Sequence, residues 1–532
     1  MAYHRGVIPP TGPGPDRDEA APDDDAASRA AADGETRSQL RGSSLLLAGR
    51  LWSVGVNLVT QVLIARHLST SDYGAFAYAL SVVALVGGLV GLGFDRAISR
   101  FLPIYHERAD HPRFLGTLVL VVGTIVGVGG AAVLAVIGLQ SWLVGGLIPD
   151  ATTTTIVALM ILLAPVEALD GILTDMFAVF RSAKAILVRK FVLAPALRLL
   201  VVVLLIATST GVEFLAVGYV LTGVLGIFLY VTMLPGLLRR AGVVGHGGRR
   251  EISIPFREIV AFTLPLLTMD LVLLSMSSLD TLIVGGVHGA DEVARLRVVE
   301  STARLNAIVF TTFSILFTPA AARLFARDDR VAMRDLYWRH AAWIAVLSFP
   351  IFVLTFSLAT PVTVALFEER YRSSGIILAT LSLARYIDAA FGANGQTIRM
   401  FGGIKEIVAV NLVTAAVHLA LALALIPSLG AEGAALAILL SYVLYNVLKQ
   451  VALRRVTGVP MFEMRYLPVY ATIAIGAAVI AGLEVTVDPP LVVAVALAAV
   501  ASVVVVAFGR RSLRIAETFP ELLRFPGGRF LR

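Results

Sequence analysis

The sequence predicts an all-α integral membrane protein with about fourteen transmembrane helices. Of its 532 residues, 57% are hydrophobic and only 15% are charged, and the mean hydropathy of +0.84 is far above that of an ordinary soluble domain. Apolar stretches of about 20 residues, the length that crosses a membrane, recur along the whole chain. Most Lys and Arg residues fall in every second connection between these stretches, as the positive-inside rule requires.

The expected spans are the apolar stretches that reach about 20 residues, or come close to it. In chain order they are 43–66, 76–95, 114–139, 154–180, 191–208, 214–237, 258–284, 298–322, 337–359, 375–398, 407–427, 432–451, 467–486 and 490–508.

The first two spans are joined by ARHLSTSDYGAFAYALS, residues 65–81. This segment contains the turn signal Asp72-Tyr73-Gly74, in which Gly tolerates positive φ and Asp can bond its own backbone. We therefore expect a polar turn here, on the outer side of the first helical hairpin.

The distribution of basic residues fixes the expected orientation, with both termini in the cytoplasm. Membrane topology also explains the net charge of +7 without nucleic acid as a partner. Residues 1–42 are rich in Pro, Gly, Ala and Asp and lack a signal peptide, so they are expected to be a disordered cytoplasmic tail. Residues 509–532 form a basic cytoplasmic tail that can lie on anionic membrane lipid.

The expected spans fall into two related groups. A Gly-rich basic segment, 238–257, separates an N-lobe of six spans, 43–237, from a C-lobe of six more, 258–456, and residues 457–508 add a final pair. The connection between spans seven and eight has the same plan as the first connection: an apolar run, small turn residues, an acidic residue and then a helix. Repeats of this kind are typical of secondary transporters, whose substrate site lies at the repeat interface near the bilayer midplane.

Enzymatic chemistry finds little support in the sequence. The chain has no cysteine and no metal-ligand cluster among its eight His residues, so no metal and no cofactor are expected. The outer loops are short, whereas membrane glycosyltransferases and polymerases usually carry catalytic groups on longer ones. We therefore expect a protein that is not an enzyme and has no catalytic residues.

Charged residues inside the expected spans are the main functional signal, because each costs about 2.5–3.5 kcal/mol at the centre of a spanning helix. Arg50, Asn57 and Gln61 share one face of the first span, and Glu300 and Arg304 have the i, i+4 spacing of an ion pair. The candidate substrate-binding residues of a central cavity are Arg50, Asn57, Gln61, Arg198, Arg304 and Arg385. The candidate coupling or ion-pair residues are Glu167, Asp170, Asp270, Asp280, Glu300 and Asp388.

These residues allow two interpretations. They can simply hold helices together through ion pairs and hydrogen bonds, which is common for Ser, Asn and Gln in membranes. The arginines favour a functional role, because guanidinium stays charged when buried and binds phosphate in a bidentate way. His418 fits an interior structural histidine as well as a proton carrier.

Two segments resemble polysaccharide flippases. IARHLSTSDYGAFAYALS is similar to their first-loop pattern, in which Arg-x-Leu precedes an acidic residue, Tyr and Gly. Residues 411–448, NLVTAAVHLALALALIPSLGAEGAALAILLSYVLYNVL, resemble their helix eleven and twelve segment. The family belongs to the multidrug/oligosaccharidyl-lipid/polysaccharide exporter superfamily, and the resemblance covers about residues 43–508.

The resemblance implies a fold, a cargo and a location. It implies two six-helix lobes in a V around a cationic cavity, with two extra helices. The implied activity is translocation of a lipid-linked oligosaccharide, typically undecaprenyl-diphosphate-linked, from the inner to the outer leaflet of the plasma membrane. Other membrane proteins of polysaccharide biosynthesis are implied partners. EVARLRVVE, residues 292–300, departs from the pattern that the family has after its seventh helix.

Three alternatives remain open. A cation-coupled small-molecule or drug antiporter of the same superfamily would be expected to have a cavity dominated by carboxylates. A flippase for the peptidoglycan precursor also uses interior arginines. A membrane-embedded glycosyltransferase or polymerase would turn over a sugar nucleotide. The arginines of this chain favour an anionic lipid-linked cargo over the first.

Overall fold

The computed structural model describes residues 46–91, 93–139, 150–180, 183–240, 242 and 252–513, with the side chains of 183, 240, 265–277, 315, 316, 511 and 512 outside that description. The described residues form helices and no strands, so the predicted all-α fold is confirmed. Eleven of these helices are long and apolar enough to cross a membrane, or up to twelve if one bent pair is a single span.

The first described helix runs from Leu46 to His67. The first bundle continues with α2 (Thr70–Gly91), α3 (Phe94–Glu107), α4 (His111–Gly138), α6 (Ala151–Met160), α7 (Leu163–Val179), α8 (Ala183–Ile186), the π-helix η1 (Leu187–Leu193), α9 (Ala194–Thr208) and α10 (Val212–Arg240). The remaining elements are α11 (Phe256–His288), α12 (Ala290–Val298), α13 (Glu300–Arg304), η2 (Leu305–Ala307), α14 (Ile308–Ala326), α15 (Arg330–Phe352), η3 (Val353–Ser357), α16 (Ala359–Phe367), η4 (Glu369–Tyr371), α17 (Ser374–Ala390), α18 (Asn394–Met400), α19 (Ile404–Thr457), η5 (Met464–Tyr466), α20 (Leu467–Val487) and α21 (Leu491–Leu513).

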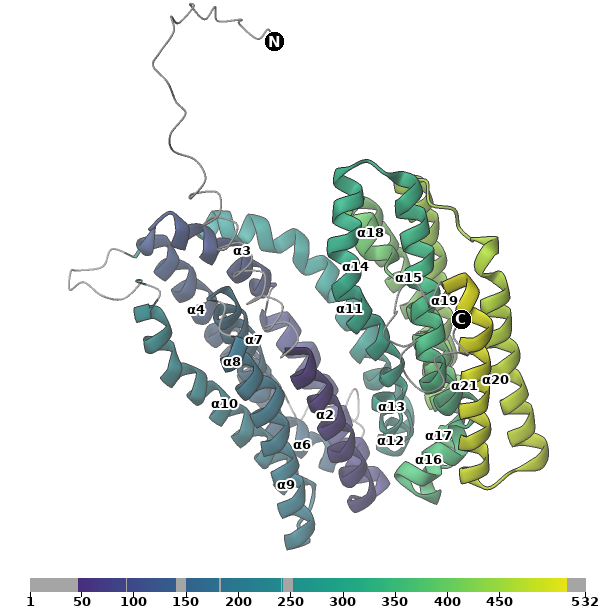
Figure 1. The fold of residues 1–532 in the computed structure, drawn as a ribbon. Helices are drawn as coiled ribbons and strands as arrows, with labels where there is room; N and C mark the ends of the chain where they lie inside the picture. Colours follow the sequence, from purple (N-terminus) through teal and green to yellow (C-terminus); the bar gives the residue numbers. More distant parts are fainter. Residues whose placement is uncertain are drawn as a thin grey trace, which may run out of the picture.

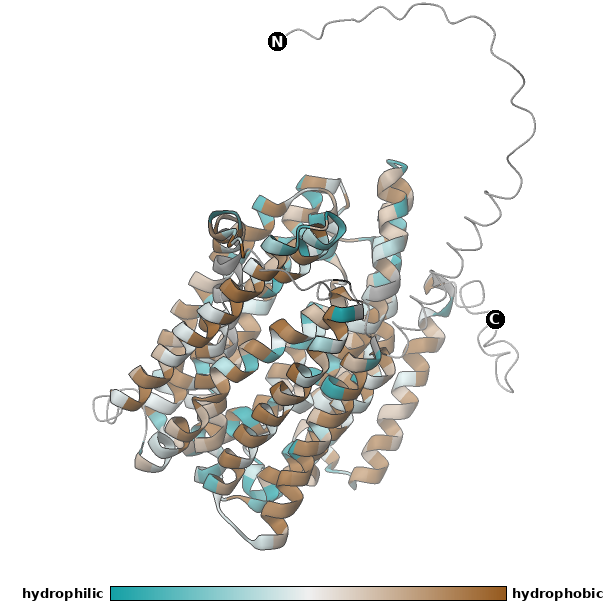
Figure 2. Ribbon diagram, turned by 90° about the vertical axis from the view of Figure 1, so that its left-hand side faces the viewer, coloured by the Kyte–Doolittle hydropathy of each residue, from teal (hydrophilic) through white to brown (hydrophobic). Residues whose placement is uncertain are grey.

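The helices form two bundles that converge at the end where α12 and α13 lie and diverge toward the opposite end (Figure 1). The first bundle comprises the helix Leu46–His67 and α2 to α10, and the second comprises α12 to α21. Apolar residues cover most of the helix lengths in Figure 2, and large ones such as Leu134 and Phe508 are exposed, as a lipid-facing surface requires.

Helix α11 connects the two bundles. Near its start, the Phe262 ring packs edge-on against Phe101 of α3 at 5.4 Å, and Glu258 accepts a hydrogen bond from Tyr105 of α3 at 3.1 Å. Toward its end, α11 packs on α2 and α19. A rearrangement of the two bundles must therefore bend or shift α11.

Helix α19 is a hairpin of two antiparallel segments rather than one rod. Its 54 residues are broken at Gly430, where φ is 57° and ψ is −130°. His418 Nδ1 lies 3.0 Å from Ser441 Oγ, although 23 residues of straight helix would separate them by about 35 Å. Two of the predicted spans thus share α19. The total of fourteen stays a prediction.

The expected turn at Asp72-Tyr73-Gly74 is wrong in its position. The short break between the first described helix and α2 ends at Ser69. The Oγ of Ser69 accepts the backbone N–H of Asp72 at 3.0 Å, and its hydroxyl donates to the Asp72 carboxylate at 2.7 Å. This pairing resembles a capping box, so α2 starts at Thr70 and the three residues lie in its first turns. Gly74 leaves space for a neighbouring helix and is not a turn residue with positive φ.

Gly74 lies where α2 of the first bundle packs directly against α12 of the second. A Cβ built on it would lie 1.9 Å from the carbonyl oxygen of Ala290, the first residue of α12. Gly285 of α11 makes a similar contact, because its Cβ would lie 2.5 Å from the ring of Tyr78. Only glycine allows the helices to pack this closely.

Two arginines join the bundles at the same end in a reciprocal way. Arg66 donates to the carbonyl oxygens of Leu366 at 2.8 Å and Ala365 at 2.6 Å, at the end of α16. Arg370 donates to the last carbonyls of the first described helix and just beyond, among them Leu68 at 3.0 Å. Each arginine therefore satisfies carbonyls that a helix C-terminus leaves unpaired, across the bundle interface.

The predicted domain boundaries, 43–237, 258–456 and 457–508, stay predictions. The tail 1–42 lies outside the described residues, and so do 241 and 243–251 of the expected linker and 514–532 of the C-terminal tail.

Candidate functional site

Three adjoining pockets follow the interior of the two bundles. The N-pocket lies in the first bundle, the central pocket between the bundles, and the C-pocket in the second bundle. Asn57 and Arg198 line both the N-pocket and the central pocket, whereas Arg297 and Glu300 line both the central pocket and the C-pocket. The pockets are therefore neighbours that share polar walls.

The central cluster lies where α12 meets α13. Glu300 binds Arg297 and also accepts from Arg304 at 2.6 Å, so one carboxylate holds two guanidinium groups. Arg297 donates further to Ser81 Oγ of α2 at 2.5 Å, which carries the cluster into the first bundle. The predicted Glu300–Arg304 pair is present. The side chain of Arg304 is 57% exposed and lines the central pocket. Arg304 can thus meet a ligand without first being uncovered.

Gln61 is the contribution of the first described helix to this cluster. Its amide N–H groups donate to the Tyr73 hydroxyl at 2.8 Å and to the Arg297 carbonyl at 3.1 Å, and its carbonyl oxygen accepts from Ser301. Asn57, one turn earlier, donates to Ser53 at 3.2 Å and faces the central pocket and the N-pocket. The polar stripe predicted on this helix therefore does line the interior at these two positions.

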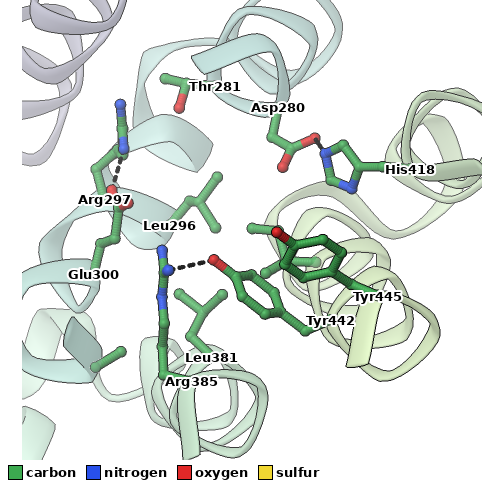
Figure 3. Close-up of a pocket in the computed structure, with 12 residues that line it drawn as sticks. Asp280, Thr281, Leu296, Arg297, Glu300, Leu381, Arg385, His418, Tyr442 and Tyr445 are labelled. Carbon is green, nitrogen blue, oxygen red and sulfur yellow. Dashed lines mark hydrogen bonds and ion pairs between the residues drawn. The ribbon is translucent and has the colours of Figure 1, made fainter. Parts of the chain in front are cut away.

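Arg385 supplies the cationic wall of the C-pocket (Figure 3). Its guanidinium donates to the hydroxyl of Tyr442 and lies 5.0 Å from the centre of that ring. Tyr442 and Tyr445 come from the second half of α19, one turn apart. Because an aromatic hydroxyl is a weaker partner than a carboxylate, Arg385 remains able to bind an anion.

The C-pocket also contains Asp280 of α11 and His418 of α19. Both side chains are 3% exposed, and His418 Nε2 lies 3.2 Å from Asp280 Oδ1 (Figure 3).

The N-pocket is lined by two cation–carboxylate pairs. Arg189 of η1 pairs with Asp170 of α7, and Arg198 of α9 lies 3.5 Å from Glu167. Arg189 is buried and also donates to the carbonyl of Gly226 at 3.1 Å. The π-helix, a rare element frequent at functional sites, changes the helical register just before Arg198.

Gly226→Ala is expected to destabilise the fold through Arg189. A Cβ at position 226 would lie 1.9 Å from Arg189 Nη2, so the guanidinium must leave its ion pair with Asp170. Breaking a buried pair costs about 3–5 kcal/mol, which predicts a clearly lower thermal unfolding midpoint in detergent. Gly236→Ala on the same helix is the control, because its Cβ meets nothing within 4 Å. Equal midpoints for the two variants would contradict this role of Gly226.

Three predicted residues lie apart from the pockets or outside the description. Arg50 is exposed near the start of the first described helix and lines none of the three pockets. Asp388 of α17 forms an ion pair with Lys449 at 3.1 Å and accepts a hydrogen bond from Asn446 at 3.1 Å. The Lys449 ammonium group lies 3.8 Å from the centre of the Tyr445 ring. The side chain of Asp270 is outside the described residues.

The remaining candidates line at least one pocket, and their roles stay predictions. They are Asn57, Gln61, Glu167, Asp170, Arg198, Asp280, Glu300, Arg304 and Arg385. Sequence reasoning missed Arg297 and Arg189, because both precede spans that were expected to start at 298 and 191. No group of three potential metal ligands was found among the described residues.

Comparison with known proteins agrees with this architecture. Residues 63–375, more than half of the chain, match the family described as polysaccharide biosynthesis protein. No curated protein sequence gives a significant match.

Solved structures with a similar fold are transporters. The lipid II flippase MurJ in an inward-closed conformation matches with a TM-score of 0.68 and 12% identity, over 90% of this chain and 100% of that one. An inward-facing multidrug resistance transporter of the MATE family, of the MOP superfamily, matches with a TM-score of 0.58 and 14% identity, over 76% of this chain and 95% of that one. The MATE multidrug transporter DinF-BH in complex with R6G matches with a TM-score of 0.55 and 14% identity, over 80% of this chain and 97% of that one. At these identities the likeness shows the fold.

The family match, the helical fold and the many apolar helices agree with one another. The chain is a multi-pass membrane protein that belongs to the polysaccharide biosynthesis protein family and has the fold of multidrug/oligosaccharidyl-lipid/polysaccharide exporters.

Proposed function

We propose that the protein is a flippase that moves a lipid-linked oligosaccharide, of the undecaprenyl-diphosphate type, from the inner to the outer leaflet of the plasma membrane. The observation that carries this proposal is the set of arginines from both bundles that line adjoining pockets: Arg198, Arg297, Arg304 and Arg385. A diphosphate head group cannot cross hydrocarbon unaided, and guanidinium groups bind phosphate through paired N–H donors.

Glu300 makes reversible binding possible. In the empty pocket this carboxylate satisfies Arg297 and Arg304, so their charges are not left unpaired inside the membrane. A phosphate would displace it from Arg304, whose side chain is the more exposed of the two arginines. Return of Glu300 then favours release, and this exchange keeps the head group from binding too tightly to leave.

The closed end of the molecule agrees with alternating access. The contacts of Gly74, Arg66 and Arg370 lie beside connections that the positive-inside pattern places outside. The described conformation would therefore be open toward the cytoplasm, where a lipid-linked substrate is loaded. The head group would occupy the pockets while the prenyl tail stays in lipid beside the bundles.

The test is the leaflet distribution of lipid-linked oligosaccharide in cells depleted of the protein. An impermeant reagent labels only outer-leaflet glycans, so depletion should abolish outer labelling while intact lipid-linked intermediates accumulate inside. Re-expression of the wild-type protein should restore labelling. Unchanged outer labelling after depletion would refute the flippase and direct attention to a drug-efflux assay for the antiporter alternative.

A further inference from the structure

The contact between Asp280 and His418 reveals where a hydrogen atom must be. Ser441 donates its single hydroxyl proton to the carbonyl of Ala437 at 2.7 Å. His418 Nδ1 lies 3.0 Å from the same Ser441 oxygen, which can therefore only accept from it. Nδ1 of His418 thus carries a proton. In a neutral ring the other nitrogen, Nε2, which faces Asp280, would then have no proton.

The second ring nitrogen, Nε2, lies 3.2 Å from Asp280 Oδ1. With Nδ1 protonated, a neutral ring would turn the lone pair of Nε2 toward a carboxylate, which is repulsive. One further proton between Nε2 and Oδ1 turns this repulsion into an attractive contact, whichever of the two atoms holds it. In the described part of the chain neither oxygen of Asp280 has another hydrogen-bond partner, and the side chain is buried. The proton shared with His418 is therefore what gives this buried carboxyl group a hydrogen bond.

We propose that Asp280 and His418 form a proton-binding site in the wall of the C-pocket, and that its proton stabilises the conformation in which the bundles converge at the Gly74 end. The two residues join α11 to the first half of α19. Since α11 also packs on α3 of the first bundle, the contact ties the connecting helix to the second bundle. Loss of the proton opposes this tie and favours the other conformation.

Other charged and titratable groups around the pair come from four elements. They are Arg297 of α12, Glu300 of α13, Arg385 of α17, and Tyr442 and Tyr445 of α19. Glu300 is paired with Arg297 and also with Arg304, and Arg385 is bound to Tyr442. Asp280 and His418 are therefore the two groups lining this pocket whose own contact requires a proton.

The direction of coupling rests on the proposed function. The described conformation is the one that would face the cytoplasm, so a proton bound from outside favours the return of the empty transporter to it. Release of that proton to the cytoplasm, together with head-group binding, favours the outward-facing form. One proton moves inward for each head group that moves outward, and no covalent bond changes.

The experiment measures conformation in the absence of any lipid-linked substrate. The chain has no cysteine, so Thr210→Cys and Thr486→Cys add the only two thiols. Both positions are exposed: Thr210 lies in the connection after α9 of the first bundle, and Thr486 lies in the last turn of α20 of the second, so the pair reports on the separation of the two bundles. Spin labels at both sites in lipid nanodiscs give the distance distribution between pH 5 and 9. In the wild-type background we expect the converged population to fall as pH rises, with its ratio to the separated population changing up to about tenfold per pH unit, the limit for one proton.

Asp280→Asn is the test variant, because an amide N–H can donate to His418 Nε2 without titrating. Its distribution should stay converged across the pH range. His340→Gln is the matched control: His340 is another buried histidine of the second bundle, packed on Phe317 at 4.4 Å, and its loss should leave the wild-type pH response unchanged.

A wild-type distribution that does not change with pH would overturn the proposal. So would an equal pH response in Asp280→Asn, or a shift produced by sodium in place of choline at constant pH, which would indicate a sodium site. None of these outcomes depends on the lipid-linked substrate. A negative leaflet assay would therefore refute the proposed flippase while leaving the proton site testable by itself.

Discussion

Gly74→Val is expected to prevent the two bundles from closing at their contact end and to abolish transport. The Cβ alone would lie 1.9 Å from the Ala290 carbonyl oxygen, so α2 and α12 must separate to admit any side chain. Neither partner can yield easily, because the obstacle is backbone. Overpacking of this kind costs about 1–3 kcal/mol. That corresponds to about a 5- to 150-fold shift toward the conformation with separated ends.

The shift can be measured by thiol accessibility in the chain, which has no cysteine of its own. Asn57→Cys places a single thiol in the central pocket. An impermeant maleimide added outside the cell should label it slowly in the wild-type background and faster with Gly74→Val, by about the factor given above. Gly127→Val is the matched control, because a Cβ at that glycine meets nothing within 4 Å. Similar labelling in both variants would show that the Gly74 contact does not close this end.

The sequence predicted the helices correctly where hydropathy alone determines them. It misplaced helix boundaries where charged residues form ion pairs in the protein interior. Long apolar stretches indicated the helices of both bundles. Residues 290–297 were expected to belong to the connection before a span that starts at 298, yet they form most of α12 (Ala290–Val298). Arg295 binds Glu292 and Glu432, and Glu292 accepts the backbone N–H of Ala431 at 3.1 Å, at the break in α19. Hydropathy does not detect such pairing, so Arg297, on the same helix, was missed.

The candidate site was predictable as a set of residues and not as an arrangement. The Glu300–Arg304 pair follows from helical spacing and is confirmed. The contact between Asp280 and His418 is different, because it joins α11 to α19 across most of the second bundle's sequence. Likewise, Gly74 looks like a turn residue until α12 is placed against it. Contacts between distant helices depend on tertiary packing, which a single sequence does not specify.

Combined Arg304→Ala and Arg385→Ala substitutions are expected to reduce translocation by about 100-fold or more. Each arginine offers charge-assisted hydrogen bonds to an anionic head group, worth about 1.5–3 kcal/mol each. The two lie in neighbouring pockets linked by Glu300, so one diphosphate-sugar head group can meet both. The measurement is outer-leaflet labelling in depleted cells that express the double variant at wild-type level in the membrane.

The control must remove guanidinium groups without touching the pockets. Arg372→Ala serves, because Arg372 is exposed and pairs with Glu369 in its own connection. Full translocation by the double variant would contradict the anionic head-group site even if depletion itself abolishes outer labelling. Arg304→Lys then separates two properties of arginine. A lysine keeps the positive charge near Glu300 but loses the bidentate geometry that suits phosphate. A partial defect in this variant would show that the pocket recognises the shape of a phosphate group, whereas a normal rate would show that charge alone is enough.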